Sequence, residues 1–598
     1  MTKTRVLLSS FLLTLVLLAS CGPISGTTPP GTTSPGTTKP DETTKPPTTT
    51  TSSEPQYGGT LNVLWNSDPM GFDEAYTPMM MCPTLKTTNE ELLSGAWAKG
   101  PRGTREFDWL NGYGGRLGAE IPFLAENWEM PDDTTIIIRV RKGVHFALDI
   151  NNEASKLVAG REMTAEDVAY SIDRCWNMPA SFINTSNAVA DKPTSIKAID
   201  KYTVEIKTPA TAQGLNLFIC GDQARIVPAE VISKYGDMKD WRKSVGTGPW
   251  ILRDYTPASS IIFTKNNNYW GTDPFVPGNK LPYANGVKVL IIADLSTRLS
   301  AIRTGKLDLA NDLLLTWDDL QEMTKSYPIL QYKKANGSHF ALWGREDKED
   351  LPFKDLRVRQ ALNMGVNKKA LVDDYYQGHA DLFAPIYPLT DSFAPFNTPL
   401  EEMPQGVQDL FIYDPEKAKQ LLAEAGYPDG FDTKVACNAS DADFLSVIVE
   451  DWKKINVNLE IQAMETGVFN SVMRGRSFEQ MLYKESVSRG FPYKMNETRI
   501  QNTDDVAYFD HERTRKAYSD VQPYVGKDDD AWISIIHDIY PFIIEQAPGV
   551  WLPVPHVYRM WQPWILGYNG EYNVGYDNQH VYMQYIWIDQ TKKKSLGF

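Results

Sequence analysis

The chain has 598 residues, of which 42% are hydrophobic, and its formal net charge at pH 7 is −15. This acidic balance argues against nucleic acid or an anionic lipid surface as the main partner. A chain of this length is more than one hydrophobic core usually supports, so we expect two or three lobes.

Residues 1–20 are predicted to be an export signal. A charged start with Lys3 and Arg5 precedes an apolar run that is too short for a stable transmembrane helix. The run ends in "LASC", which resembles the lipobox of bacterial lipoproteins and implies acylation of Cys21. An ordinary secretory signal followed by a chance Cys is the alternative. No second stretch of about 18 apolar residues follows, so the lipid on Cys21 would be the only membrane anchor.

Residues 21–56 are predicted to form a disordered spacer. After Cys21 the segment is nearly all Thr, Pro, Ser and Gly, so it has no apolar face to bury and cannot offset the entropy of ordering. Proline keeps such a chain extended at roughly 3 Å per residue, which gives a reach on the order of 100 Å. We expect the spacer to hold a globular body near a membrane while leaving it free to move.

The body begins with two predicted strands and a capped helix. Thr60–Trp65 alternates with a period of two after a pair of glycines, as a first strand would. Residues 134–146 predict another strand, with Ile136–Ile138 buried on both faces. In the following helix, Thr164 is the expected N-cap and Asp167 completes a capping box. Its predicted buried face consists of Val168, Ile172, Cys175 and Trp176.

Two later helices extend the same pattern. Asp414 is predicted to cap a helix with Pro415 in its first turn, and Gly426 ends it where a left-handed residue is favoured. A helix at residues 444–455 then leads into a strand at residues 457–464, which is half of a βαβ unit. These elements predict an α/β protein with more than one sheet, but they give no function.

The sequence carries no short catalytic or metal-binding signature. No GxSxG, HExxH or GxxxxGK[ST] motif occurs, and the 7 His are dispersed. These absences favour a binding protein without a cofactor, although enzymes that use a pair of carboxylates have no such signature. Cys175 and Cys220 are the candidate disulfide pair, and buried free thiols are the alternative. The cysteines besides Cys21, which form no CxxC pair, are Cys82, Cys175, Cys220 and Cys437.

Longer stretches of sequence, taken in their order along the chain, give more information about function than the short motifs do. They are "YGGTLNVL", "FLAENWEMPDDTTIIIRVRKGVHF", "REMTAEDVAYSIDR", "VGTGPWILRDY" with "NNNYWG", "RLSAIRTGKLDLAND", "LPFKDLRVRQALNMGVNKKALVDDYYQGHA", "YDPEKAKQLLAEAGYPDGF" and the tail "QPWILGYNGEYN". In this order they resemble the extracytoplasmic solute-binding proteins of the oligopeptide and dipeptide family, which serve ABC importers. The resemblance covers nearly the whole body.

The resemblance implies an α/β fold built as a two-lobed clamp, like other periplasmic binding proteins, with discontinuous lobes and an extra domain. Such clamps close over a ligand by hinge motion. The implied segments are residues 57–80, 195–330 and 557–598 for lobe I, residues 81–194 for the extra domain II, and residues 331–556 for lobe III.

Some residues in the matching stretches are expected to build the scaffold and not the binding site. Gly246 and Gly248 suit a tight turn that brings the backbone close to the opposite lobe. Arg357 and Arg359 are expected to pair with neighbouring carboxylates on a helix.

The chain departs from the peptide-binding branch of the family at one conspicuous stretch. In that branch an Asp there meets the free ammonium group of the peptide, whereas "FEQMLYKESVSRGFPYKMNE" contains no Asp. Glu485 is a possible substitute. Lys484 and Arg489 beside it discourage a cation and favour a carboxylate, a phosphate or a sugar hydroxyl.

Position along the family pattern gives further ligand-binding candidates. Met80 follows the first strand near the groove mouth, and Trp343 and Arg345 lie where a strand that crosses between the lobes lines the groove. For each candidate, core packing or a surface ion pair is the alternative.

We therefore expect a monomeric, lipid-anchored receptor on the extracytoplasmic face of the cell membrane. It would deliver a peptide or another medium-sized solute to an ABC permease, without a cofactor or metal and without nucleic acid. One alternative is a binder of an oligosaccharide or other anionic solute that acts in transport or signalling. A more remote alternative is a carbohydrate-active enzyme, which needs two carboxylates facing each other at roughly 5 to 9 Å.

Overall fold

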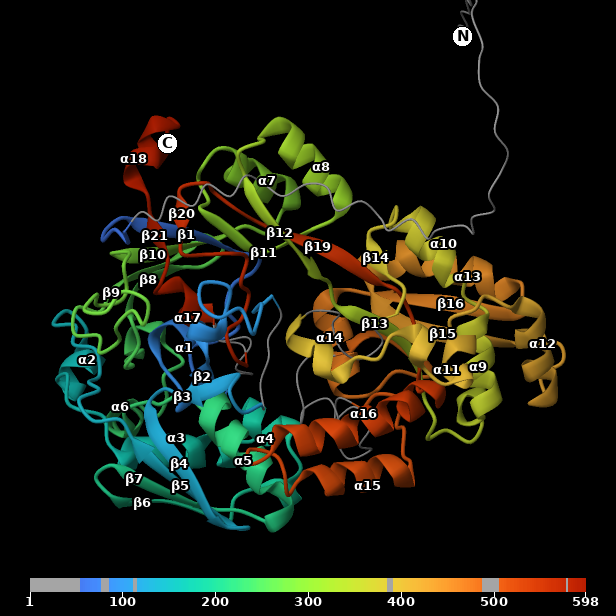
Figure 1. Cartoon of the computed structure of the whole chain (residues 1–598), viewed down its shortest axis with the longest axis horizontal. Coiled ribbons are helices and arrows are strands. Elements are labelled where there is room, and N and C mark those ends of the chain that lie inside the picture. The colour runs from blue at the N-terminus through green and yellow to red at the C-terminus, as the bar shows by residue number, and fades with distance from the viewer. Residues whose placement is uncertain (1–53, 77–84, 111–115, 384–390, 487–504, 577–578) are drawn as a thin grey trace, which may run out of the picture. The chain divides into compact units, whose positions relative to one another are not determined.

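The computed structural model of the protein describes residues 54–76, 85–110, 116–383, 391–486, 505–576 and 579–598 (Figure 1). Residues 55–598 form one compact unit. The predicted leader, Cys21 and most of the spacer lie outside the described residues, as do Met80 and Arg489. Among the described residues, no helix is both long enough and apolar enough to cross a bilayer.

The largest sheet has eight strands that come from distant parts of the chain. The predicted first strand is confirmed as β1 (Thr60–Trp65), which lies inside this sheet and pairs in parallel with β10 (Gly286–Ile291) and β11 (Leu309–Leu315). The remaining strands are β8 (Trp250–Thr256), β9 (Ser260–Lys265), β12 (Gln331–Asn336), β14 (Ala380–Asp381) and β19 (Val554–Trp561).

A second sheet has five strands in the order β16-β15-β17-β13-β18. The strand β15 leads through α13 (Ala442–Lys453) to β16 and pairs with it in parallel, which confirms the predicted helix and strand of a βαβ unit. The strands of this sheet are β13 (His339–Gly344), β15 (Phe431–Asn438), β16 (Val457–Met464), β17 (Met481–Ser486) and β18 (Gly549–Trp551).

A third sheet is antiparallel and has four strands: β4 (Ala125–Asp132), β5 (Thr135–Val140), β6 (Ser195–Asp200) and β7 (Thr203–Lys207). Ile136 and Ile138 are buried, but Ile137 between them is half-buried. The prediction that this run is buried on both faces is therefore wrong, because an antiparallel sheet commonly packs only one face against a core. The expected domain boundary at residue 194 falls just before two strands of this sheet.

Shorter elements complete the described fold. Two strand pairs are formed by β2 (Leu93–Gly95) with β3 (Glu120–Pro122) and by β20 (Ile565–Leu566) with β21 (Trp587–Ile588). The other α-helices are α1 (Leu85–Thr88), α2 (Glu153–Val158), α3 (Ala165–Asn177), α4 (Phe182–Ser186), α5 (Gln213–Phe218), α6 (Ala229–Tyr235), α7 (Leu295–Arg303), α8 (Trp317–Ser326), α9 (Leu356–Met364), α10 (Lys368–Ala370), α11 (Gln405–Asp409), α12 (Pro415–Glu424), α14 (Thr466–Arg474), α15 (Glu512–Val521), α16 (Asp529–Glu545), α17 (Gln579–Met583) and α18 (Gln590–Ser595).

The helix ends form as local chemistry predicts. At the start of α3, Thr164 and Asp167 make both halves of the capping box. At the start of α12, the carboxylate of Asp414 accepts a hydrogen bond from the Lys417 backbone N–H at 2.9 Å. Gly426 follows this helix with φ at +97°, a conformation that strains any residue with a Cβ.

The two faces of the five-stranded sheet pack against different cores. One face, which we call the helix face, includes Leu342 and Tyr483 and packs with apolar residues of α9, α12 and α13. The opposite face, which we call the Trp343 face, includes Trp343 and Leu482 and belongs to the largest core, together with residues of α14 and α16. Figure 1 shows these two sets of helices around the sheet.

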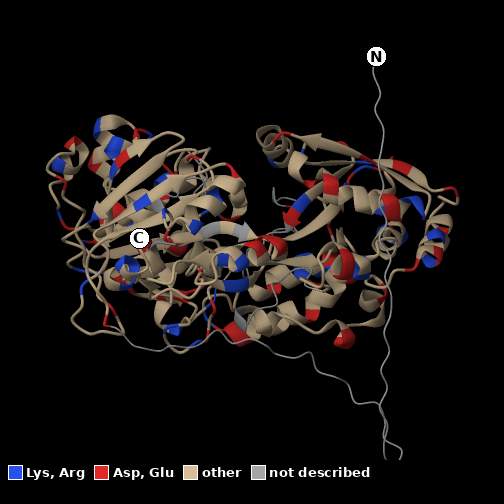
Figure 2. Cartoon of the chain, turned by 90° about the horizontal axis from the view of Figure 1, so that it is seen from above, with Lys and Arg blue, Asp and Glu red and all other residues tan. Residues whose placement is uncertain are grey.

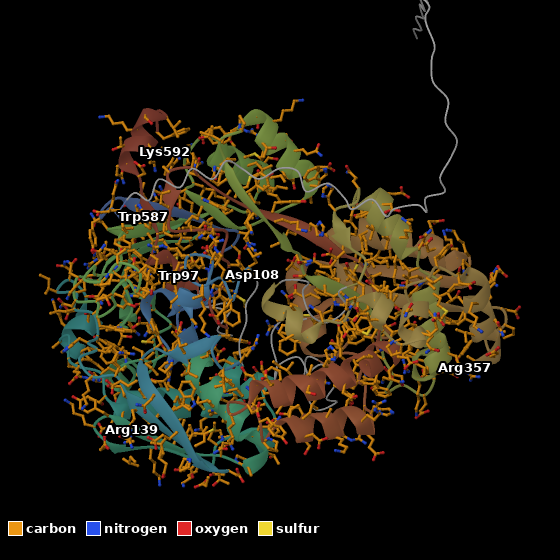
Figure 3. All side chains as sticks on the ribbon, viewed as in Figure 1. Trp97, Asp108, Arg139, Arg357, Trp587 and Lys592 are labelled. Carbon is orange, nitrogen blue, oxygen red and sulfur yellow. The ribbon has the colours of Figure 1, made fainter. Side chains whose placement is uncertain are left out.

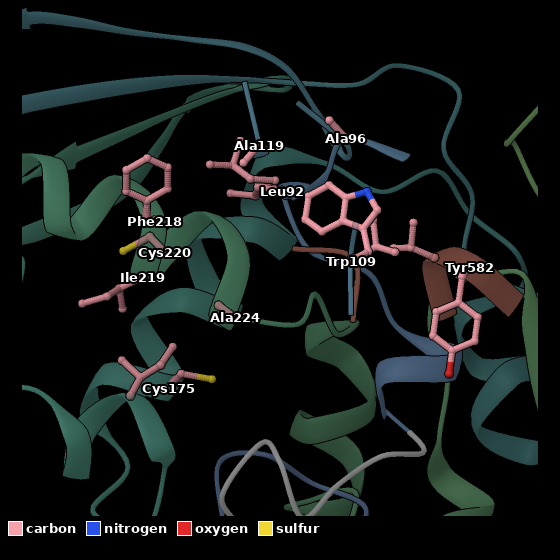
Figure 4. Packing of buried hydrophobic residues seen from close by; sticks show 14 of the residues in the cluster. Leu92, Ala96, Trp109, Ala119, Cys175, Phe218, Ile219, Cys220, Ala224 and Tyr582 are labelled. Atoms are coloured by element: carbon pink, nitrogen blue, oxygen red, sulfur yellow. The ribbon is translucent and has the colours of Figure 1, made fainter. Parts of the chain in front are cut away.

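The cysteines that the structure describes are buried free thiols: Cys175, Cys220 and Cys437. Cys175 and Cys220 form no disulfide, and Figure 4 shows both among the packed side chains of the largest core. Burial raises the pKa of Cys220 to about 12, so the unreactive thiol is its stable form. Cys82 lies outside the described residues.

Basic residues (Lys, Arg) and acidic residues (Asp, Glu) are interspersed along the ribbon in the view of Figure 2. A few of them are buried and paired. Arg174 in α3 donates to both carboxylate oxygens of Asp73 at 2.8 and 2.7 Å. This paired contact ties α3, which flanks the four-stranded sheet, to the segment that follows β1.

Candidate functional site

Two adjacent connections join the eight-stranded sheet to the five-stranded sheet. Gly337–Ser338 links β12 to β13, and Leu552–Pro553 links β18 to β19; we call them the hinge crossings. Because β12 pairs with β19 and β13 pairs with β18, both crossings belong to one antiparallel ribbon. The Gly337 N–H donates to the Pro555 carbonyl at 2.7 Å. A short ribbon of this kind is where two packed bodies can rotate with few backbone changes.

Trp343 and Lys484 lie on the same face of the five-stranded sheet. In the antiparallel register Trp343 is opposite Leu482 and Ala341 is opposite Lys484, and opposed residues point to the same side. The indole N–H of Trp343 donates to the Lys484 carbonyl at 3.2 Å. Trp343 is 5% exposed and Lys484 is 8% exposed, so the structure brings two predicted candidates together in a largely dry setting.

Glu485 lies on the opposite face of the sheet from Lys484. It is exposed and pairs in register with Phe340, on the helix face. Successive residues of a strand point to opposite sides, so adjacency in sequence does not make Lys484 and Glu485 neighbours in one site.

The guanidinium group of Arg345 is held by groups of the protein. Its Nε donates to the Asp347 carboxylate at 2.8 Å, and its Nη1 donates to the carbonyls of Arg476 and Phe478 at 3.2 and 3.3 Å. The ring of Tyr508 lies 4.4 Å from the guanidinium carbon. Hydrogen bonding to Arg345 lowers the pKa of Asp347 below its usual range. This arrangement fixes the end of β13 to the segment that precedes β17.

The residues expected to build the scaffold do so. Arg357 pairs with Asp355 at 2.5 Å, and Figure 3 shows Arg357 at the outer edge of the body that contains the five-stranded sheet. Arg359 pairs with the half-buried Glu346 at 3.0 Å, a carboxylate that follows β13 and does not lie on the same helix as expected.

The glycines of "VGTGPW" also have a scaffold role, in close backbone packing. A Cβ on Gly246 would lie 2.2 Å from the Thr88 carbonyl oxygen, and one on Gly248 would lie 2.8 Å from it. The partner, Thr88, is in the predicted extra domain.

Two aromatic residues near Trp343 were not predicted from the sequence. The Trp551 ring packs edge-on against Trp343 at 5.8 Å between centroids, and it stacks with buried His339 at 5.8 Å. The sequence pattern that could have identified His339 is the period-two alternation of β13, which places His339 and Trp343 on one face. Among the described residues, no cluster of His, Cys, Asp and Glu side chains is arranged to hold a metal ion.

Comparison with known proteins places this geometry in context. The model of the bacterial extracellular solute-binding proteins, family 5 (middle region), matches residues 120–500. Heme-binding protein A of Haemophilus influenzae is 28% identical over 467 residues, which cover 73% of this chain and 78% of that protein. Di/tripeptide-binding protein 1 of Pseudomonas aeruginosa is 27% identical over 394 residues, which cover 62% of this chain and 68% of that protein.

Solved structures share the fold along nearly their whole length. The periplasmic binding protein DppA from Helicobacter pylori, in complex with the peptide STSA, superposes with a TM-score of 0.66 at 20% identity, covering 90% of this chain and 99% of that one. The oligopeptide-binding protein AppA from Bacillus subtilis, in complex with a nonapeptide, gives a TM-score of 0.68 at 20% identity, covering 90% and 100%. The two-lobed α/β fold predicted from the sequence is thus confirmed, and the chain belongs to the family 5 bacterial extracellular solute-binding proteins.

Proposed function

We propose that the protein is an extracytoplasmic receptor that binds a peptide, or another solute of similar size, and delivers it to an ABC importer. The family match over residues 120–500 carries this proposal, because the family consists of extracellular solute-binding proteins. The shared fold with two peptide complexes supports it. We infer a binding role and not a catalytic one, since the family and the relatives compared above are binding proteins.

The Trp343 face is the part of the described structure that we propose contacts the solute. Trp343 offers a rigid apolar ring, and the Lys484 side chain supplies a positive charge on the same side of the sheet. Arg345 and Glu485 have less support, because Arg345 is engaged by protein groups and Glu485 lies on the helix face. The further candidates, which lie outside the described residues, are Met80 and Arg489.

The solute is proposed to present an anionic or hydroxyl group to this face, and not a free ammonium group. A desolvated ammonium without a carboxylate partner costs several kcal/mol, and the stretch where the family's peptide binders carry an Asp has none here. A Lys on the Trp343 face would repel that ammonium and attract a carboxylate or phosphate.

The binding proposal is tested with the full chain, purified without refolding, in two steps. Native mass spectrometry identifies a solute that copurifies, and calorimetry then compares free and N-acetylated peptides. We expect N-acetylation to change the affinity by less than about threefold, and Lys484→Met to weaken binding of an anionic solute by about 1 to 3 kcal/mol. Lys419→Met, on the surface of α12, is the matched control and should bind normally. A strict requirement for the free amine, with normal binding by Lys484→Met, would contradict the proposal.

We further propose that Cys21 carries the lipid that keeps the receptor beside its transporter. The support is the "LASC" sequence after an apolar run and the Thr/Pro-rich segment that follows it. Cys21→Ser should release an unacylated protein from the membrane fraction, because no other predicted anchor remains. Cell fractionation and intact mass would show this; Cys21→Ser protein that stays with the membrane would overturn the anchor.

A further inference from the structure

A cavity of about 590 Å³ lies directly beside the hinge crossings. Ser338 from one crossing and Leu552–Pro553 from the other form part of its wall. The start of α8, with Trp317, lines it from the side of the eight-stranded sheet, and the start of α13, with Phe444, lines it from the side of the five-stranded sheet. The volume falls within the range of about 300 to 1,000 Å³ that is typical of small-molecule sites.

This hinge cavity is separate from the proposed solute-contacting face. Its lining residues on the five-stranded sheet are Phe340 and Tyr483, which lie on the helix face. Trp343 and Lys484 point to the other side of the same strands and do not line it. Because the transported solute is proposed to contact the Trp343 face, a ligand in the hinge cavity would be a second ligand.

Aromatic rings make up one wall of the hinge cavity. Phe340 stacks on Tyr483 with 5.0 Å between ring centroids, and Phe444 lies 6.0 Å from Tyr483. Tyr375 packs edge-on against Phe444 at 5.3 Å and against Tyr376 at 4.9 Å. The negative faces of such rings attract cations. Weakly hydrated cations lose the least hydration free energy when they enter such a cavity.

The charges around the hinge cavity also favour a cation. Asp441 and Asp443 line it beside the aromatic wall, and Asp318 lines it from α8, whereas none of its described lining residues is Lys or Arg. Two histidines also line it. His379 stacks on Trp317 at 3.7 Å, and burial lowers the pKa of His379, which favours its neutral form. His556 is paired with a carboxylate outside the lining, with 3.1 Å between its Nε2 and Oδ1 of Asp381. The cavity thus combines carboxylates and aromatic rings, without Lys or Arg in its described lining.

We propose that the hinge cavity binds a compact methylated ammonium compound, with its positive group over the aromatic rings and close to Asp441 and Asp443. Three methyl groups on nitrogen spread the charge over an apolar surface, which suits a wall of rings with carboxylates at its edge. A neutral molecule of the same shape would gain only the apolar contact.

Occupancy of the hinge cavity is coupled to the hinge itself. The amide of Gln377 donates to both carboxylate oxygens of Asp318 at 3.1 Å, which ties α8 to the segment that leads into β14. The start of α13 lines the cavity from the side of the five-stranded sheet, so rotation at the hinge crossings changes its separation from α8. By linkage, a cation that fits one hinge angle better shifts the affinity for the transported solute, and the solute shifts the affinity for the cation by the same factor.

The experiment titrates the full chain with choline and, separately, with 3,3-dimethylbutan-1-ol, the neutral analogue in which carbon replaces nitrogen. Ligand-observed NMR measures both affinities. We expect saturable choline binding that is at least about tenfold tighter than binding of the neutral analogue. Absence of saturable choline binding, or equal affinity for the two probes, would overturn the proposal.

Variants locate the choline site in the cavity. Asp441→Asn combined with Asp443→Asn should weaken choline binding by about tenfold or more, and Trp317→Leu should weaken it as well. Asp374→Asn removes the same charge from an exposed neighbour that does not line the cavity, and should stay within about twofold of wild type. If the circular dichroism spectrum shows that the double variant does not fold, the single variant Asp443→Asn, at an exposed position, replaces it in the test. Choline binding that is unchanged in a folded Asp443→Asn or double variant would refute the assignment.

Discussion

At the residue scale, the protein buries carboxylates whose pKa values are raised by desolvation. Glu90 accepts hydrogen bonds from the Tyr269 hydroxyl at 2.7 Å and the Trp270 indole at 3.0 Å, yet burial still raises its pKa to about 7. Glu346 behaves in the same way, with a pKa raised to about 7 despite its ion pair with Arg359. A carboxyl group of this kind binds a proton more tightly in the folded chain than in the unfolded chain.

The raised pKa of Glu90 predicts a pH dependence of stability with a definite sign. Below about pH 4.5 the group is protonated in both states. Between there and about pH 7 it ionises only in the unfolded chain, so the free energy of unfolding falls as the pH rises. Glu90→Gln removes this dependence. As the pH rises from 4.5 to 8, the free energy of unfolding of the variant should therefore increase by about 3 kcal/mol relative to that of wild type.

Urea unfolding midpoints measured across this pH range check the prediction. A constant offset between Glu90→Gln and wild type reports altered hydrogen bonds, whereas a difference that grows with pH reports the titration. Glu126→Gln, at an exposed position on β4, is the control and should run parallel to wild type. Parallel profiles for Glu90→Gln and wild type would show that Glu90 does not titrate differently on folding.

At the scale of elements, features set by neighbouring residues could be predicted from the sequence. The capping box of Thr164 and Asp167 and the cap of Asp414 depend on side chains within one turn of the backbone they bind. The burial of Ile137 could not be predicted in this way, because it depends on how many faces of the sheet are covered. Whether Cys175 and Cys220 form a disulfide also could not be predicted, because it depends on the packing of a core that is assembled from distant segments.

The candidate site shows the same division. Family order placed Trp343 on the lobe-crossing strand and Lys484 in the stretch where the peptide binders carry an Asp. Only the register of β13 with β17 shows that these two residues share a face and that Glu485 does not. Register is fixed by long-range pairing, so charge patterns read along one strand combine residues from both sides of the sheet. The hinge cavity was not predicted from the sequence for the same reason, since its walls come from segments more than 200 residues apart.

At the scale of the whole molecule, the eight-stranded and five-stranded sheets are the two bodies of the proposed clamp, and one antiparallel ribbon carries the chain between them at Gly337–Ser338 and Leu552–Pro553. One side of that ribbon leads to the Trp343 face and the other to the hinge cavity. We expect a solute that closes the bodies over the Trp343 face to change the backbone at both crossings, because these two-residue segments are the shortest connections between strands of the two sheets in the described chain. The chain also passes between the sheets through β14, over longer segments.

Hydrogen exchange of the full chain, with and without its copurified solute, tests this account most directly. We predict slower exchange in peptides that span residues 336–345 and 548–556, because closure restrains the crossings and covers the Trp343 face. The four-stranded sheet of β4, β5, β6 and β7 is the internal control and should exchange at an unchanged rate. Protection confined to that sheet, or unchanged exchange at the crossings under saturating solute, would contradict binding between two bodies that close at this ribbon.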